Sequence, residues 1–184
     1  MNTLPGVWLD DLTQQEVASR IDGNAVVLVP VISAGPPAPH LPLKTAGLIA
    51  RALCHKLMER LAVAVAPLID ADSFSQQQTL GQVLGDRLAG VRALGARRIA
   101  VLELSASPLR TLEVPAEGLV LRVGDRMGDG EYLTSCLMAL DPRSVRMPLL
   151  PAGSRAQAFA GERGMAAEVD ALVDGLIAKW PDLA

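Results

Sequence analysis

The sequence has few aromatic residues and only two histidines and two cysteines. Phe, Trp and Tyr together make up 3% of the 184 residues, so a core has to be built mainly from Ala, Val, Leu and Ile. Cys54 and Cys136 lie far apart, each within an expected helix, and no Cys or His pair has zinc-finger spacing. We therefore expect two buried free thiols rather than a disulfide or a structural zinc site.

A basic patch and a long apolar run are also missing. The formal net charge is -3, and Lys and Arg alternate with Asp and Glu along the chain, whereas a nucleic-acid-binding protein usually shows a basic patch or stripe. The longest apolar runs fall short of the roughly 20 residues that span a bilayer. The sequence begins without the basic and apolar segments of a secretory signal. These features predict no nucleic-acid partner, no membrane partner and a cytoplasmic location.

What the sequence does contain is enough apolar material for one core. Half of the residues are hydrophobic and 20% are charged, which is typical of a globular protein. No internal repeat or linker divides the chain, so we expect a single domain over residues 1–184.

Apolar runs typical of strands alternate with segments of helical periodicity. Thr13 and Glu16 have the spacing of a capping box at the start of a first helix that ends near 22–23. The expected strands are 24–30, 63–69, 98–104 and 118–123, with a further edge strand at 144–150. The expected helices are 45–61, 80–94, 131–140 and 163–180, the last of them preceded by a surface loop over 151–162. This alternation predicts an α/β protein, a three-layer α/β/α sandwich with a mainly parallel central sheet.

The loop after the first long strand is chemically sparse. Ligands of open α/β sheets bind at the carboxyl ends of the strands, yet residues 35–39 read Gly-Pro-Pro-Ala-Pro. None of these side chains is an acid, a base, a nucleophile or a metal ligand. His40 follows directly, at the mouth of the expected crevice.

Several segments resemble, in order, the motifs of the creatininase family, which are metal-dependent amidohydrolases. Residues 39–45, Pro-His-Leu-Pro-Leu-Lys-Thr, resemble the family's loop Glu-Gln-His-Gly-Pro-His-Leu-Pro-Leu-x-Thr-Asp. Residues 134–138, Thr-Ser-Cys-Leu-Met, resemble its Glu-Thr-Ser-Leu-Met helix, and 98–102 precede the place of its Asn-Gly-His-Gly-Gly-Asn loop. The resemblance covers nearly the whole chain and implies a creatininase-like fold.

The resemblance also implies that most of the family's metal ligands are absent. The Glu, His and Asp ligands of the first motif align with Gly35, Pro37 and Ala46. The paired ligands of the later motif align with Glu131 and Leu133, of which only Glu131 can hold a metal. Catalytic zinc needs about three protein ligands plus an open position. Our first hypothesis is therefore a non-catalytic protein, or pseudoenzyme, with a degenerate metal site and no cofactor.

Such a protein would act as a structural or regulatory subunit, or bind a small molecule in the vestigial pocket. The resemblance implies homo-oligomers, and assembly with a partner protein subunit is the related expectation. The choice between these roles stays open.

The alternative hypothesis is an active amidohydrolase that cleaves C–N bonds of small, including cyclic, amides at a rebuilt Zn or Mn site. Its weak candidate ligands are carboxylates at strand ends and at a helix start: Asp70, Asp72, Glu103 and Glu131. His40 is its weak candidate for a catalytic base, although bracing the loop through a hydrogen bond is the role we favour. The alternative requires the four carboxylates to converge.

Overall fold

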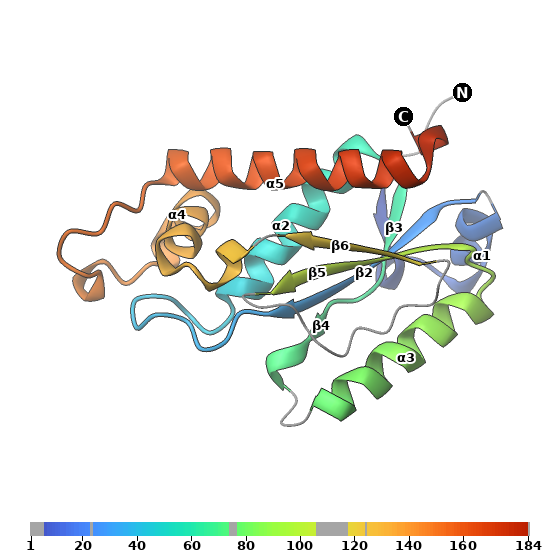
Figure 1. Ribbon diagram of the computed structural model, residues 1–184, viewed down its shortest axis with the longest axis horizontal. Coiled ribbons are helices and arrows are strands. Elements are labelled where there is room, and N and C mark those ends of the chain that lie inside the picture. The colour runs from blue at the N-terminus through green and yellow to red at the C-terminus, as the bar shows by residue number, and fades with distance from the viewer. Residues whose placement is uncertain (1–5, 23, 74–76, 106–117, 124, 184) are drawn as a thin grey trace.

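A parallel sheet forms the middle layer of the molecule in the computed structural model, which describes residues 6–22, 24–73, 77–105, 118–123 and 125–183 (Figure 1). The strand order is β1-β3-β2-β5-β6, with β4 pairing beside β2. All of these pairings are parallel. The strands are β1 (Val7–Trp8), β2 (Val26–Ser33), β3 (Val63–Val65), β4 (Ile69–Asp70), β5 (Arg98–Ser105) and β6 (Leu119–Val123).

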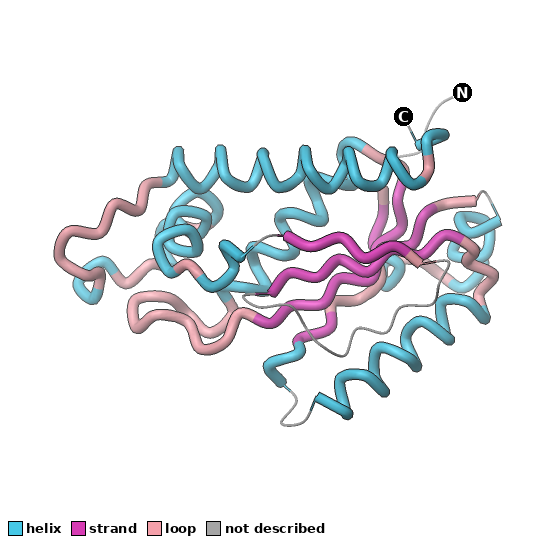
Figure 2. The backbone as a smooth tube through the Cα atoms, in the orientation of Figure 1, coloured by secondary structure: helices cyan, strands magenta, loops and turns pink. Residues whose placement is uncertain are grey.

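Helices cover both faces of this sheet and make three layers (Figures 1 and 2). The helices are α1 (Gln14–Asp22), α2 (Thr45–Arg60), α3 (Gln77–Ala93), α4 (Gly130–Leu140) and α5 (Ala158–Lys179). The larger buried cluster joins α2, α4 and α5 to one face, and the smaller cluster joins α1 and α3 to the other. The predicted α/β/α sandwich is confirmed.

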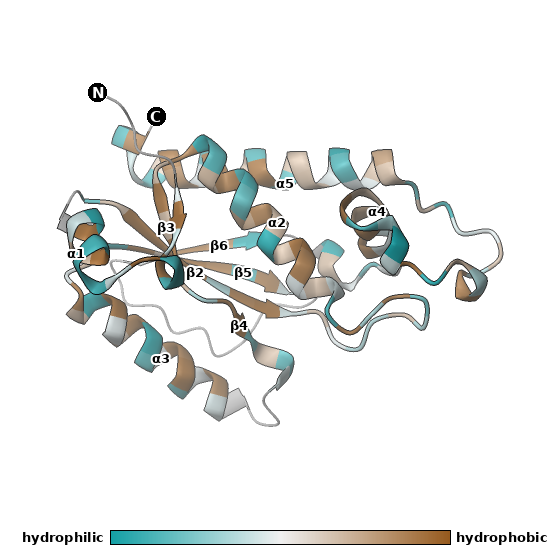
Figure 3. Cartoon of the chain, turned by 180° about the vertical axis from the view of Figure 1, so that it is seen from behind, coloured by the Kyte–Doolittle hydropathy of each residue, from teal (hydrophilic) through white to brown (hydrophobic). Residues whose placement is uncertain are grey.

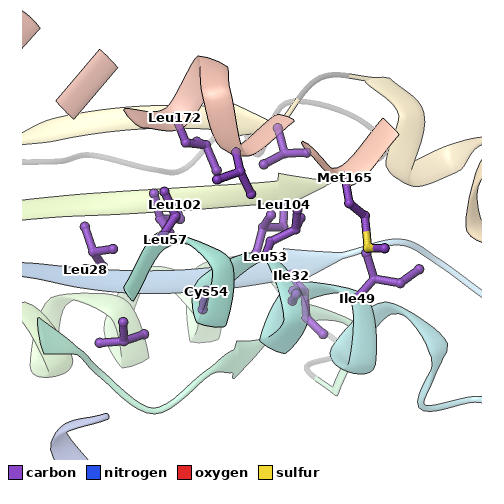
Figure 4. Close-up of a cluster of buried hydrophobic side chains, with 14 of the residues drawn as sticks. Leu28, Ile32, Ile49, Leu53, Cys54, Leu57, Leu102, Leu104, Met165 and Leu172 are labelled. Atoms are coloured by element: carbon purple, nitrogen blue, oxygen red, sulfur yellow. The ribbon is translucent and has the colours of Figure 1, made fainter. Parts of the chain in front are cut away.

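The apolar side chains of β2 pack into the buried clusters on both faces of the sheet. Val26 and Leu28 belong to the larger cluster, whereas Val27 and Val29 belong to the smaller one, because successive side chains of a strand point to opposite faces. Figure 4 shows Leu28 and Ile32 of β2 in the larger cluster, beside side chains of α2, β5 and α5. Figure 3 shows the hydropathy along the chain, with largely hydrophobic central strands and helices of mixed character.

The capping box expected at the first helix is present. The Thr13 amide donates to Glu16 Oε2 at 2.8 Å, and the Glu16 amide donates to Thr13 Oγ1 at 3.4 Å. The Thr13 hydroxyl also donates to Glu16 Oε2, and these bonds hold the pKa of the Glu16 carboxyl below its usual value. The local sequence alone therefore sets where α1 begins.

Helices α4 and α5 approach each other closely at Gly161 (Figure 1). A Cβ at Gly161 would lie 2.1 Å from the carbonyl oxygen of Ser135, which is far inside van der Waals contact. Only glycine permits this approach, and the amide of Gln157 donates to Ser135 Oγ just before α5 begins.

Three expected elements differ from the observed ones. The edge strand expected at 144–150 is wrong, because that region forms 3-10 turns at Pro142–Ser144 and Met147–Leu149. Proline lies within the first two positions of each turn, where its fixed φ favours a turn and its missing N–H disfavours a sheet ladder.

The other two differences concern boundaries. The strand expected at 63–69 is divided into β3 and β4, with Pro67 between them. The last helix begins at Ala158, five residues before the expected start, because Gly161 and Gly164 interrupt the apolar period where α5 packs most closely.

Both cysteines are buried and free, as expected. Burial raises the pKa of Cys54 to about 12 and that of Cys136 to about 11. None of the helices that the structure describes has both the length and the apolarity needed to cross a bilayer.

Candidate functional site

A cavity of about 970 Å³ opens at the carboxyl ends of β2 and β4. The loop after β2, the first two turns of α2 and the turn after β4 form its walls. The chain leaves β2 toward β3 on one side of the sheet and later places β5 on the other side, so this is a topological switch point of the kind where α/β proteins bind ligands. The lining contains the charged residues Lys44, Arg51, Asp70 and Asp72, together with apolar side chains of β2, α2 and α3.

The three positions that align with the family's first ligand set lie together on this cavity. Gly35, Pro37 and Ala46 all line it, so the loop and the start of α2 meet as the resemblance implies. Their side chains contain no donor atom for a metal. Gly35 also has a φ of 66°, in the left-handed region, where a residue with a Cβ would be strained.

Asp72 holds this loop in place. Its Oδ2 accepts hydrogen bonds from the amides of Ala34 and Gly35, both at 2.9 Å, and its Oδ1 accepts from Ser33 Oγ at 2.8 Å. Asp70 supports the same turn, because its Oδ1 accepts from the Asp72 amide at 3.1 Å. These two carboxylates therefore stabilise the cavity wall through the chain's own donors.

Glu103 lies elsewhere, inside the sheet. Its side chain is fully buried, and it is the register partner of Arg122 on the neighbouring strand. Arg122 Nε donates to Glu103 Oε2 at 2.5 Å, and Ser105 Oγ donates to Oε1 at 2.9 Å. This is a cross-strand ion pair on the face of the sheet that α1 and α3 cover.

Glu131 lies in the first turn of α4, where Asp129 caps the helix. Its Oε1 accepts a hydrogen bond from the Arg155 amide at 2.8 Å. The carboxylate thus holds the segment that leads into α5.

His40 is buried and braces the loop. Its Nε2 lies 2.7 Å from Thr134 Oγ1, and the Thr134 hydroxyl donates to the carbonyl of Gly130 at 2.6 Å. The hydroxyl hydrogen is used in that bond, so His40 Nε2 is the donor to Thr134 Oγ1. The Nδ1 atom is buried without a hydrogen-bond partner. His40 is not among the residues that line the cavity.

The four candidate carboxylates therefore occupy three places. Asp70 and Asp72 share the turn after β4, Glu103 lies within β5, and Glu131 lies on α4. Across the described ranges, no group of three or more His, Cys, Asp and Glu side chains has the arrangement of a metal site. The residues at the ligand positions of the first motif do not fit the metal that this fold implies, because Gly35, Pro37 and Ala46 offer no side-chain ligand. A site at other positions stays a prediction.

Sequence reasoning missed two cavity residues, Lys44 and Arg51. They are seven residues apart, which is nearly two turns of helix and puts both on one face of α2. That spacing next to the loop motif was the available signal.

The architecture defines the class: a doubly covered, parallel α/β protein with a cavity at the strand ends. Solved structures of creatininases have the same fold. A glutamate-to-glutamine mutant creatininase complexed with creatine has a TM-score of 0.77 and 18% identity, with 96% of this chain and 99% of that chain covered. A creatininase described as "Creatininase Mn" has a TM-score of 0.75 and 17% identity, with 96% of this chain and 99% of that chain covered. Creatinine amidohydrolase (creatininase) has a TM-score of 0.74 and 17% identity, with 95% of this chain and 98% of that chain covered.

These identities are low, and the likeness shows a creatininase-like fold. No family model matches the sequence, and no curated protein does. The resemblance first indicated by the loop and helix motifs is thus confirmed at the level of the fold.

Proposed function

We propose that this chain is a non-catalytic protein with a creatininase-like fold, kept for what its cavity or its surface binds. It would act as a small-molecule-binding protein or as a structural or regulatory subunit, in a homo-oligomer or with a partner protein. No resident metal or cofactor is part of this proposal.

The observation that supports it is the conformation of Gly35. Gly35 offers no side-chain ligand, and its backbone conformation also disfavours any residue that could supply one. The φ of 66° disfavours a glutamate, and the Gly35 amide is held by Asp72, one of the acids that a rebuilt site would need. This conformation therefore supports the proposal that no ligand side chain is used at this position.

The second candidate is an amidohydrolase with a metal bound at new positions, and the likeness to creatininases favours it. Its ligands would come from Asp70, Asp72, Glu103 and Glu131, with His40 as base. Each of these carboxylates already accepts at least one hydrogen bond from the chain, which gives it a structural role without a metal.

Metal content and stability separate the two candidates. The purified protein would be subjected to elemental analysis and melted with Zn²⁺, with Mn²⁺ and with EDTA, and creatinine hydrolysis would be assayed under the same conditions. A metal that binds only the folded state at a hundred times its dissociation constant adds about 2.7 kcal/mol of stability. We expect metal-free protein, unchanged melting and no hydrolysis.

Stoichiometric metal with a melt that EDTA lowers would overturn the proposal. In that case Glu131→Gln should abolish metal binding, whereas Glu162→Gln, which changes an exposed glutamate on α5, should not.

A further inference from the structure

The charged side chains of the cavity differ in how they are already used. Four of them line it: Lys44, Arg51, Asp70 and Asp72. The Asp72 carboxylate accepts three hydrogen bonds and Asp70 accepts one, all of them from uncharged donors of the chain. The acids therefore have partners without any ligand.

The two cations lack such partners. Neither Lys44 nor Arg51 forms an ion pair with any acid in the part of the chain that the structure describes. The Arg51 guanidinium lies 5.4 Å from the ring centre of Trp8, a cation–π contact that positions it without neutralising its charge. The first turn of α2, all of it described, contains no acidic residue.

Apart from Ser33 and Ser73, the rest of the lining is apolar. Ile32, Leu48, Leu68 and Leu80 face the cavity from β2, α2, the segment before β4 and α3. Small-molecule sites are mostly apolar, hold about 300–1,000 Å³ and orient the ligand with a few polar groups. Of the four charged side chains on this lining, the two cations are the ones without a hydrogen bond or an ion pair to any described residue.

We propose that this cavity binds a small organic anion, with its carboxylate or phosphate group against Lys44 and Arg51 and its apolar body on the leucine and isoleucine side chains. The inference rests on the proposed function, because a metal on Asp70 and Asp72 would change the charge of the same cavity. The inference adds the chemical class of the ligand to the proposed function.

Four probes that share a phenyl ring and differ in charge test this: phenylacetate, phenyl phosphate, 2-phenylethanol and 2-phenylethylamine. Each is titrated into the full chain by calorimetry, at low ionic strength and in the presence of EDTA. We expect the two anions to bind at least tenfold more tightly than the alcohol, and the amine more weakly than the alcohol. The tighter of the two anions identifies carboxylate or phosphate as the preferred group.

Variants locate the site. Lys44→Gln and Arg51→Gln should each weaken anion binding by about tenfold, as expected for the loss of one charge-assisted contact. Arg51→Lys keeps the charge and should retain most of the affinity. Lys56→Gln removes a cation from the same helix outside the cavity lining and should change nothing. If Arg51→Gln melts early, the exposed Lys44 decides the outcome alone.

Equal binding of all four probes, or anion binding that neither variant weakens, would overturn the inference. Such a failure in a metal-free protein with an EDTA-independent melt would leave the proposed function intact. Anion binding that appears only after Mn²⁺ is added would overturn both, because the metal would then hold the anion.

Discussion

The carboxylates in two neighbouring parts of the strand-end region differ in burial and in hydrogen-bond partners. On the β2–β4 side, Asp72 lies on the surface of the cavity and accepts hydrogen bonds from a hydroxyl and two amides. On the β5–β6 side, Glu103 is fully buried and is paired with the half-exposed Arg122. The first arrangement shapes a loop, and the second joins two strands.

The difference shows that an acid near a strand end is not by itself a sign of catalysis. Uncharged donors suffice for Asp72 because water reaches its side chain. The buried Glu103 needs a cation as well, since a buried charge without a partner is strongly destabilising. Both acids have structural roles that follow from their burial.

Breaking the buried pair should have the largest effect. Arg122→Leu removes the guanidinium that pairs with Glu103 Oε2, and we expect the free energy of unfolding to fall by about 3 kcal/mol, as when one partner of a buried pair is removed. Urea unfolding followed by circular dichroism measures this. The double variant with Glu103→Leu should recover most of the loss, and a double variant as unstable as the single one would contradict our reading of the pair.

The hydrogen bonds between Asp72 and the loop after β2 should contribute less to stability. Asp72→Ala removes three hydrogen bonds from a solvent-exposed site, and we expect a loss of about 2 kcal/mol together with faster proteolysis of the loop after β2. Asp70→Ala removes one hydrogen bond and is the matched control. If Asp72→Ala lowered the free energy of unfolding as much as Arg122→Leu, the proposed difference between the exposed and the buried carboxylate would be wrong.

The hydrogen bond between His40 and Thr134 should have the next largest effect on stability. Thr134→Val removes the acceptor for His40 Nε2 and the donor to Gly130, and we expect a loss of about 1–1.5 kcal/mol. Thr134→Ser keeps the hydroxyl and should retain most of the stability in the same urea titration. Equal losses in the two variants would mean that the methyl group, rather than the hydroxyl, holds this contact.

An exposed ion pair gives the smallest effect and calibrates the buried one. Arg60 and Asp170 form a salt bridge whose side chains are 45% and 65% exposed. Arg60→Ala should lower stability by about 0.5 kcal/mol or less, because exposed pairs are screened by water and salt. A loss near that of Arg122→Leu would show that burial is not what separates the two pairs.

Much of the fold followed from local patterns. The apolar run of β2, the helical period of α2 and the capping box before α1 each have a physical cause within a few residues, so their positions were predicted closely. The failures have two causes. Near Met147 the prolines are a local signal for turns that the apolar run concealed. The early start of α5 instead depends on the close contact of Gly161 with α4, a partner segment that the local pattern does not contain.

For the site, the residue types are enough to establish that the side chains of Gly35, Pro37 and Ala46 supply no metal ligand in any fold. The roles of the remaining charged residues depend on how the chain folds. Asp72 and Glu103 are both acidic residues near the end of a strand. Asp72 nevertheless holds a loop, whereas Glu103 is buried and paired with Arg122. The spacing of Lys44 and Arg51 places them on one helix face, but the folded chain is needed to show that both line the cavity, because the cavity walls come from segments distant in the chain.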